Sequence, residues 1–231
     1  MNKVKGPDMT LPDEFKRTVV IAVDLQNDCI EPDGAWPIYN REELLRSAKI
    51  ALDACRAARL PIVYTQNWYD PRGVDALYHE ALNGGRPTHS VGRAADIHVD
   101  LKPEASDLLV RKQRPSAFYN TNLEILLRRS NADHLIMFGA WSEVCLETTV
   151  WDAISRDYRI TIVKDACGTA TELMHMTAML DLANWLYAGS VITADNLKKA
   201  LEGMPHKAWR FDRPAAFAYT LENVKSLYNS L

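Results

Sequence analysis

The 231 residues can bury one full hydrophobic core, and a composition of 47% hydrophobic and 25% charged residues, with 10 Gly and 11 Pro, excludes collagen-like, low-complexity and wholly disordered chains. Lys and Arg number 27 against 30 Asp and Glu, so a net charge of -3 gives no attraction for a phosphate backbone or an acidic membrane surface, and we expect no nucleic-acid or membrane partner. No apolar stretch approaches the ~18–20 residues of a membrane span, and the N-terminal residues lack the apolar centre of a signal peptide, which predicts a cytoplasmic protein.

Apolar runs of strand length alternate with segments of helical period along the chain, which is typical of a parallel sheet covered by helices. The predicted strands are 18–24, 61–65, 107–111, 134–139, 159–163 and 190–193, and the predicted helices are 41–58, 122–129, 143–157, 171–187 and 215–228. The sequence therefore predicts an α/β fold with three layers, α/β/α, in which helices cover both faces of a six-stranded, mostly parallel, Rossmann-like sheet.

Two segments stand apart from this alternation. Residues 66–106 are polar, contain Gly and Pro and show no sustained period, so we interpret them as a lid or pocket wall. Residues 1–203 are expected to form one domain. Residues 204–231 are expected to form a C-terminal extension that packs on this domain or on a partner subunit.

Three residues of chemical interest stand at the ends of predicted strands. Asp24 ends the first strand, Lys112 follows the strand at 107–111, and Cys145 follows the strand at 134–139. Because ligands bind outside the carboxyl ends of strands in an open α/β sheet, we expect the three side chains to converge on one rim. Together they supply a base, an orienting cation and a nucleophile for covalent acyl transfer. Taken singly, the plainer interpretations are a capping Asp, a solvated Lys and a core Cys.

The four cysteines lie far apart and form no CxxC pair, a spacing that fits neither a disulfide framework nor a zinc knuckle. We predict free thiols at Cys29, Cys55, Cys145 and Cys167. A redox-sensing thiol is one hypothesis for Cys145. It is disfavoured because no resolving cysteine is adjacent in sequence, although Cys29 or Cys167 can approach in space.

Four segments between residues 18 and 196 resemble the isochorismatase-like cysteine hydrolases, and in particular their amidohydrolase branch, which includes N-carbamoylsarcosine and ureidoacrylate amidohydrolases. The segments are VVIAVDLQND at 19–28, KQRPSAFYNT at 112–121, GAWSEVCLETTVWDA at 139–153 and VKDAC at 163–167. Each is moderately specific alone, and four in the family's order make coincidence improbable.

The resemblance implies that Asp24, Lys112 and Cys145 form a catalytic triad. It also implies a non-proline cis peptide bond between Ala140 and Trp141, with the backbone N–H groups of Trp141 and Cys145 as the oxyanion hole. A homo-oligomer, dimer or tetramer, is implied as well.

Departures from the family narrow the expected activity. Isochorismatases that cleave a vinyl ether typically lack the cysteine, so Cys145 favours attack at a carbonyl carbon. Nicotinamidases usually carry a metal site that begins Asp-x-His after the second strand, whereas Asn67 and Tyr69 stand here, so we predict no metal. Glu143 stands where Asp or Asn is common, and Trp141 is bulky where a small residue is usual.

A flat, polar and aromatic pocket is expected around the triad, although core packing is the alternative for its aromatic residues. The residues predicted to contact substrate are Gln26, Asn67, Trp68, Tyr69, Tyr119 and Trp141, with Trp36 as a further candidate.

The resulting hypothesis is a cysteine hydrolase that cleaves a C–N bond of a small linear amide, ureide or carbamoyl compound. A thioester forms, water hydrolyses it, and no cofactor is needed. A ureide or carbamoyl substrate is preferred over a simple carboxamide. The alternatives are a vinyl-ether hydrolase with Cys145 as a bystander, and a non-catalytic binding protein of the same fold.

Overall fold

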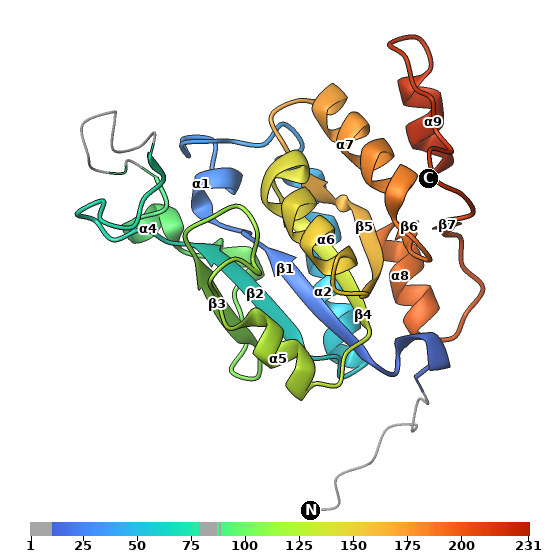
Figure 1. Cartoon of the computed structure of the whole chain (residues 1–231), viewed down its shortest axis with the longest axis horizontal. Helices are drawn as coiled ribbons and strands as arrows, with labels where there is room; N and C mark the ends of the chain where they lie inside the picture. The colour runs from blue at the N-terminus through green and yellow to red at the C-terminus, as the bar shows by residue number, and fades with distance from the viewer. Residues whose placement is uncertain (1–10, 79–86, 88) are drawn as a thin grey trace, which may run out of the picture.

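The computed structural model describes residues 11–78, 87 and 89–231, which form a twisted sheet between two layers of helices (Figure 1). The seven strands stand in the order β3-β2-β1-β4-β5-β6-β7. They are β1 Thr18–Val23, β2 Ile62–Asn67, β3 Leu108–Lys112, β4 His134–Ala140, β5 Arg159–Gly168, β6 Ser190–Ile192 and β7 Trp209–Arg210. Every pair is parallel except β6 with β7.

The helices differ widely in length. The α-helices are α1 Asn27–Ile30, α2 Arg41–Ala57, α4 Gly92–Ala95, α5 Leu123–Arg129, α6 Glu147–Ile154, α7 Glu172–Trp185, α8 Ala194–Leu201 and α9 Val224–Ser230. Two short 3-10 turns, η1 Asp13–Phe15 and η2 Val99–Leu101, and one π-helical turn, η3 Ser142–Leu146, complete the described elements.

The centre of the sheet is formed by β1 and β4, which are buried along their whole length, as continuous apolar and β-branched runs predict. α2 and α8 contact each other on one face of the sheet, while α6 and α7 cover the other face (Figure 1). From β1 the chain moves outward to β2 and β3, and it then returns to β4 on the other side of β1. The strand order therefore reverses between β1 and β4, where a ligand crevice is expected.

The predicted fold class is confirmed, but the predicted number of six strands is wrong. β7, in the segment expected to be a C-terminal extension, pairs with β6 through Trp209 and Val191. A strand of two residues is too short to produce a periodic hydrophobic pattern, so the sequence carried no signal for it. The predicted helix at 143–157 begins instead as η3, and α8 was not predicted.

Other expectations concern the long loop and the membrane. The stretch 66–106 contains α4 and η2, and residues 79–86 and 88 within it lie outside the described residues. Across the part of the chain that is described, no helix is both long and apolar enough to cross a bilayer.

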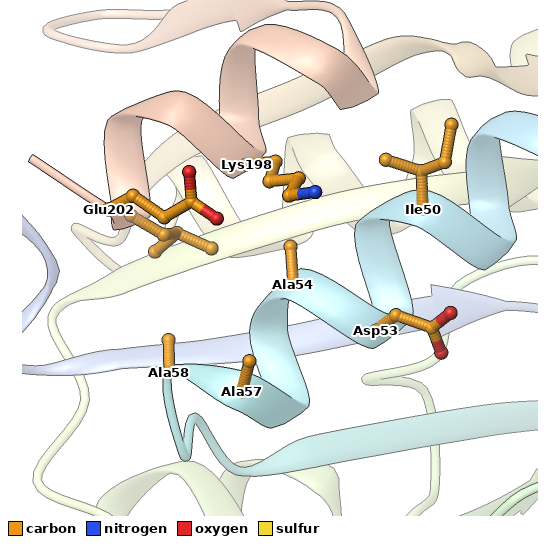
Figure 2. A pocket seen from close by; sticks show the side chains of 8 residues that line it. Ile50, Asp53, Ala54, Ala57, Ala58, Lys198 and Glu202 are labelled. Atoms are coloured by element: carbon orange, nitrogen blue, oxygen red, sulfur yellow. The ribbon is translucent and has the colours of Figure 1, made fainter. Parts of the chain in front are cut away.

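A hollow of about 290 Å³ lies between α2 and α8 (Figure 2). α2 contributes small side chains such as Ala54 and Ala57, and α8 contributes Lys198 and Glu202. None of the three candidate catalytic residues lines it.

A buried polar network crosses the amino ends of four strands. His134 Nδ1 lies 2.8 Å from Thr18 Oγ1, and His134 Nε2 lies 2.8 Å from Thr161 Oγ1, which in turn lies 2.8 Å from Ser190 Oγ. Burial, together with the positive charge of Arg159, lowers the pKa of His134 to about 3. The ring is therefore neutral in the folded protein at physiological pH.

This network predicts a loss of stability in acid. The unfolded chain protonates this imidazole below its usual pKa of 6.5, whereas the folded protein keeps it neutral down to about pH 3, so the free energy of unfolding falls as pH falls through this window. We expect the free energy of unfolding, measured in urea, to fall by about 2 kcal/mol more in the wild type than in H134Q when the pH is lowered from 7.5 to 5.0. H206Q, which changes a histidine outside the network, should follow the wild-type curve; equal pH slopes for H134Q and wild type would contradict the argument.

Candidate active site

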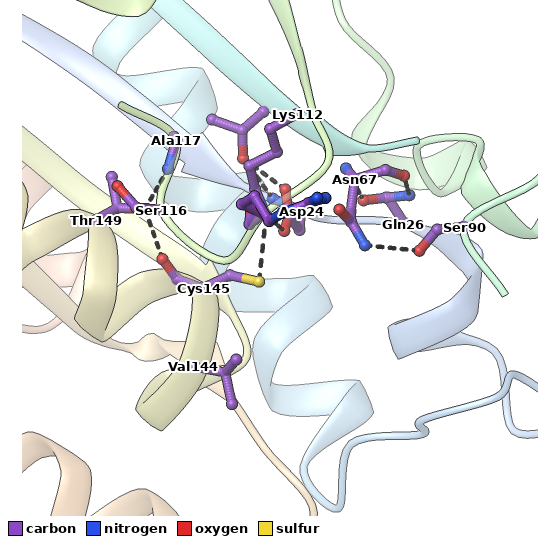
Figure 3. A network of polar contacts seen from close by, with 12 residues as sticks. Asp24, Gln26, Asn67, Ser90, Lys112, Ser116, Ala117, Val144, Cys145 and Thr149 are labelled. Atoms are coloured by element: carbon purple, nitrogen blue, oxygen red, sulfur yellow. Dashed lines mark hydrogen bonds and ion pairs between the residues drawn. The ribbon is translucent and has the colours of Figure 1, made fainter. Parts of the chain in front are cut away.

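The carboxyl edge of the sheet brings together the three residues that the sequence singled out. Asp24 follows β1, Lys112 ends β3, and Cys145 lies in η3, directly after β4. Lys112 Nζ lies 2.6 Å from Asp24 Oδ2 and 3.2 Å from Cys145 Sγ (Figure 3). One ammonium thus contacts both the carboxylate and the thiol.

The backbone at Asp24 turns its carboxylate toward this centre. Asp24 has φ +46°, in the left-handed region that Asp adopts more readily than most residues. Thr65 on β2 donates its hydroxyl to Asp24 Oδ1 at 2.6 Å and accepts a bond from the Asp24 N–H at 3.2 Å. One carboxylate oxygen is therefore held by Thr65, and the other is left for Lys112.

Gly139 allows β4 to approach β1 at the point where the strand order reverses. Its φ is +133°, and a Cβ atom there would lie 2.0 Å from the carbonyl oxygen of Val23. No other residue fits this contact without moving the backbone.

η3 is tied to its surroundings at both ends. It follows a cis peptide bond between Ala140 and Trp141, and the Trp141 carbonyl accepts bonds from two N–H groups of the turn. Thr149 donates its hydroxyl to the Cys145 carbonyl at 2.6 Å and accepts the Ala117 N–H at 3.1 Å (Figure 3). Thr149 thereby links η3 to the loop that follows Lys112.

The charges at the centre are strongly coupled. Burial opposes the positive charge of Lys112, but Asp24 and Cys145 outweigh it and hold the pKa of the ammonium above its usual value. Burial raises the pKa of Cys145 to about 12; Lys112 opposes this rise and Asp24 adds to it. At neutral pH the resting site therefore holds a protonated thiol beside an ammonium.

A cavity of about 280 Å³ opens onto Asp24 and Cys145. Its lining residues are Asp24, Gln26, Asp28, Cys29, Trp36, Asn67, Leu77, Ser90, Ala140, Trp141, Val144 and Cys145. Gln26, Asn67 and Trp141, all predicted to contact substrate, line it, as does Trp36. Asp28 and Cys29 were not predicted, although Asp28 ends the first motif and Cys29 follows it, and Leu77 and Ser90 come from a stretch without a readable pattern.

Hydrogen bonds within the protein occupy the polar groups of Gln26. Its Nε2 donates to the carbonyls of Asn67 at 2.9 Å and Ala95 at 2.8 Å, and its Oε1 accepts the Asn67 N–H at 2.7 Å. The Asn67 side chain donates to Ser90 Oγ at 2.9 Å. Gln26 therefore braces the cavity wall.

Three residues predicted to contact substrate do not line this cavity. The guanidinium of Arg111 lies over the Trp68 ring, with Arg111 Cζ 4.4 Å from the ring centroid. Tyr69 is 1% exposed in the core, and Tyr119 is 62% exposed at the surface. The chain leaves β2 at Asn67, so the side chains after it are directed by loop contacts that strand periodicity does not describe.

The cysteines are free thiols. Cys29 lines the same cavity as Cys145, whereas Cys167 is buried and donates its thiol to the Val163 carbonyl at 3.2 Å. Among the described residues, no three His, Cys, Asp or Glu side chains are grouped so that they could hold a metal ion. Metal-free chemistry stays a prediction.

The buried ion pair predicts a large effect on stability. Lys112 and Asp24 are 0% and 2% exposed, so K112M leaves a carboxylate buried without its cation and should lower the free energy of unfolding by about 3–5 kcal/mol. The double variant D24N/K112M should recover most of this loss. K49M removes an exposed pair with Asp53 and should change stability by less than about 1 kcal/mol. Denaturant unfolding measures all three, and additive losses in the double variant would contradict the coupling.

The comparisons with known proteins agree with this architecture. A family model described as the Isochorismatase domain matches residues 18–196. A ureidoacrylate amidohydrolase of Caulobacter segnis is 26% identical over 81% of this chain and 87% of its own, and an N-carbamoylsarcosine amidase of an Arthrobacter species is 27% identical over 82% and 73%. A solved cysteine hydrolase from Pseudomonas syringae pv. phaseolicola 1448A shares the fold, with a TM-score of 0.74 and 24% identity over 87% of this chain and 99% of that one. The chain therefore belongs to the isochorismatase family of hydrolases.

Proposed function

We propose that this hydrolase is a cysteine-dependent amidohydrolase that cleaves a C–N bond in a small linear amide, ureide or carbamoyl compound. One observation carries the proposal: Lys112 Nζ contacts both Asp24 and Cys145 where these two residues line a cavity of about 280 Å³. A nucleophile and a base thus face one ligand-sized cavity, and a buried cation contacts both of them, as covalent catalysis requires.

The first half-reaction forms a thioester. Asp24 accepts the Cys145 thiol proton as sulfur attacks the carbonyl carbon, and the backbone N–H groups of Trp141 and Cys145 receive the developing oxyanion. The tetrahedral intermediate collapses, the C–N bond breaks, and Asp24 returns the proton to the departing nitrogen. Ammonia or an amine leaves, and the acyl group remains on Cys145.

The second half-reaction releases the acid. Asp24 accepts a proton from water as its oxygen attacks the thioester carbon, and the C–S bond breaks when the new intermediate collapses. Asp24 then returns the proton to the Cys145 sulfur. In both half-reactions the ammonium of Lys112 stabilises the negative charge, whether it lies on Asp24 or on the Cys145 sulfur.

The names of the curated relatives favour a carbamoyl substrate. Ureidoacrylate and N-carbamoylsarcosine both carry a carbamoyl group on nitrogen, and this group fits the mechanism above with ammonia as the leaving group. The dimer or tetramer and the cytoplasmic location stay predictions.

Ammonia release from a substrate panel tests the proposal. The panel comprises carbamoyl amino acids, ureidoacrylate-like acids, biuret-like compounds, nicotinamide and maleamate. At least one should release ammonia, iodoacetamide should abolish the release, a chelator should leave it unchanged, and C145A should reduce it by more than about 1000-fold because the nucleophile is lost. Mass spectrometry should detect the acylated wild-type chain.

Other outcomes separate the alternatives. Ammonia release that survives in folded C145A requires a nucleophile other than Cys145, whereas iodoacetamide-insensitive turnover of a vinyl ether, without ammonia release from the panel, favours vinyl-ether hydrolysis. Ligand binding without turnover across the panel favours a non-catalytic binding protein.

The substitution D24N should have opposite effects on the alkylation of Cys145 and on turnover. Its negative charge and hydrogen bond help to raise the pKa of Cys145, so D24N should lower that pKa while Lys112 remains nearby. Alkylation of Cys145 by iodoacetamide at pH 7.5 should therefore become at least threefold faster, whereas turnover should be lost with the base. T65V removes only a hydroxyl that donates to Asp24, so its effects on alkylation and turnover should be smaller than those of D24N. Full turnover in D24N would show that another residue is the base.

A further inference from the structure

A hydrogen-bonded path connects the C-terminal segment to the nucleophile turn. Tyr228 on α9 places its hydroxyl 3.0 Å from His175 Nε2, and Nδ1 of the same ring lies 3.0 Å from Ser142 Oγ. Ser142 is the first residue of η3 and directly follows Trp141, whose backbone N–H is proposed for the oxyanion hole. Cys145 lies in the same turn.

The middle of this path is closed to solvent. Ser142 is 0% exposed and His175 is 1% exposed. Burial, together with the charge of Lys164, lowers the pKa of His175 to about 4, so the ring is neutral at physiological pH. A neutral imidazole donates from one nitrogen and accepts at the other, so the hydroxyls of Tyr228 and Ser142 must take opposite roles. The three groups therefore act as one directional chain.

Tyr228 is itself held firmly. The ammonium of Lys164 donates to the Tyr228 carbonyl at 3.0 Å and lies 4.5 Å from the centroid of its ring. The rings of Tyr228 and His175 meet edge to face, with centroids 5.4 Å apart. The phenol is thus a fixed point on α9, and it is not among the residues that line the catalytic cavity.

We propose that Tyr228 is a positioning residue that holds η3, and with it Cys145 and the proposed oxyanion donors, through His175 and Ser142. This inference rests on the proposed function. Tyr228 belongs to residues 204–231, outside the 18–196 range that matches the family model.

Y228F tests the proposal because it removes only the hydroxyl. We expect kcat to fall by about fivefold with KM within twofold, since the turn carries the reacting groups. Y219F is the matched control: Tyr219 lies in the same segment and donates its hydroxyl to Asp181 on the same helix α7 at 2.8 Å, without a connection to η3. Y219F should leave kcat unchanged, and thermal unfolding should show both variants folded.

A double variant tests the path itself. S142A should reproduce the effect of Y228F, S142T should retain most of the activity because it keeps a hydroxyl, and S142A/Y228F should be no slower than S142A alone. Multiplying losses in the double variant would overturn the proposal.

Alkylation of Cys145 supplies a readout that needs no substrate. A loosened turn exposes the half-buried thiol more often, so iodoacetamide should modify Cys145 at least threefold faster in Y228F and S142A than in wild type and Y219F. If no substrate is turned over but this contrast is seen, the proposed function fails while the positioning role stands. If Y228F and Y219F behave alike in both assays, the positioning role is wrong.

Discussion

The ammonium of Lys112 lies out of water between a carboxylate and a sulfur, and much of the surrounding fold depends on this burial. An unpaired buried charge costs several kcal/mol, so the arrangement is stable only if every proton of the ammonium finds an acceptor. Asp24, Cys145 and the Arg114 carbonyl at 3.1 Å supply three acceptors for its three protons. Strand β3 must therefore keep its register against β2, because a slip of one residue would turn Lys112 to the opposite face of the sheet.

The backbone at the centre of the sheet follows from the same requirement. The side chain at the end of β1 has to meet a cation from β3 and a thiol beyond β4. Asp24 turns toward them with a positive φ, and Gly139 lets β4 close onto the Val23 carbonyl. Gly139 lies within the buried strand β4, and Asp24 directly follows the buried strand β1, so neighbouring hydrogen bonds hold both conformations in place. Two of the described residues with positive φ thus lie where the strand order reverses, beside the proposed catalytic residues.

The sequence predicted the position of this centre better than its walls. Parallel strands share a carboxyl edge, so finding Asp24, Lys112 and Cys145 after three strands was enough to bring them together. Strand ends do not show which hydrogen bonds remain free for a ligand. The side-chain amide of Gln26 donates to the carbonyl of Ala95, which belongs to a stretch with no readable period, and Tyr69 packs in the core. These outcomes depend on contacts between segments distant in sequence, which single-sequence patterns do not record.

Helix α7 explains how the C-terminal segment, outside the matched residues 18–196, is connected to η3. Asn184 exchanges two hydrogen bonds with the backbone of Phe217, and Asp181 accepts the Tyr219 hydroxyl. These bonds fix the C-terminal segment along one helix, and His175 on that helix carries the connection onward to Ser142. His175 thus connects α9 to η3 through α7, so the residues at the strand ends and the proposed support of the turn lie on different parts of the chain.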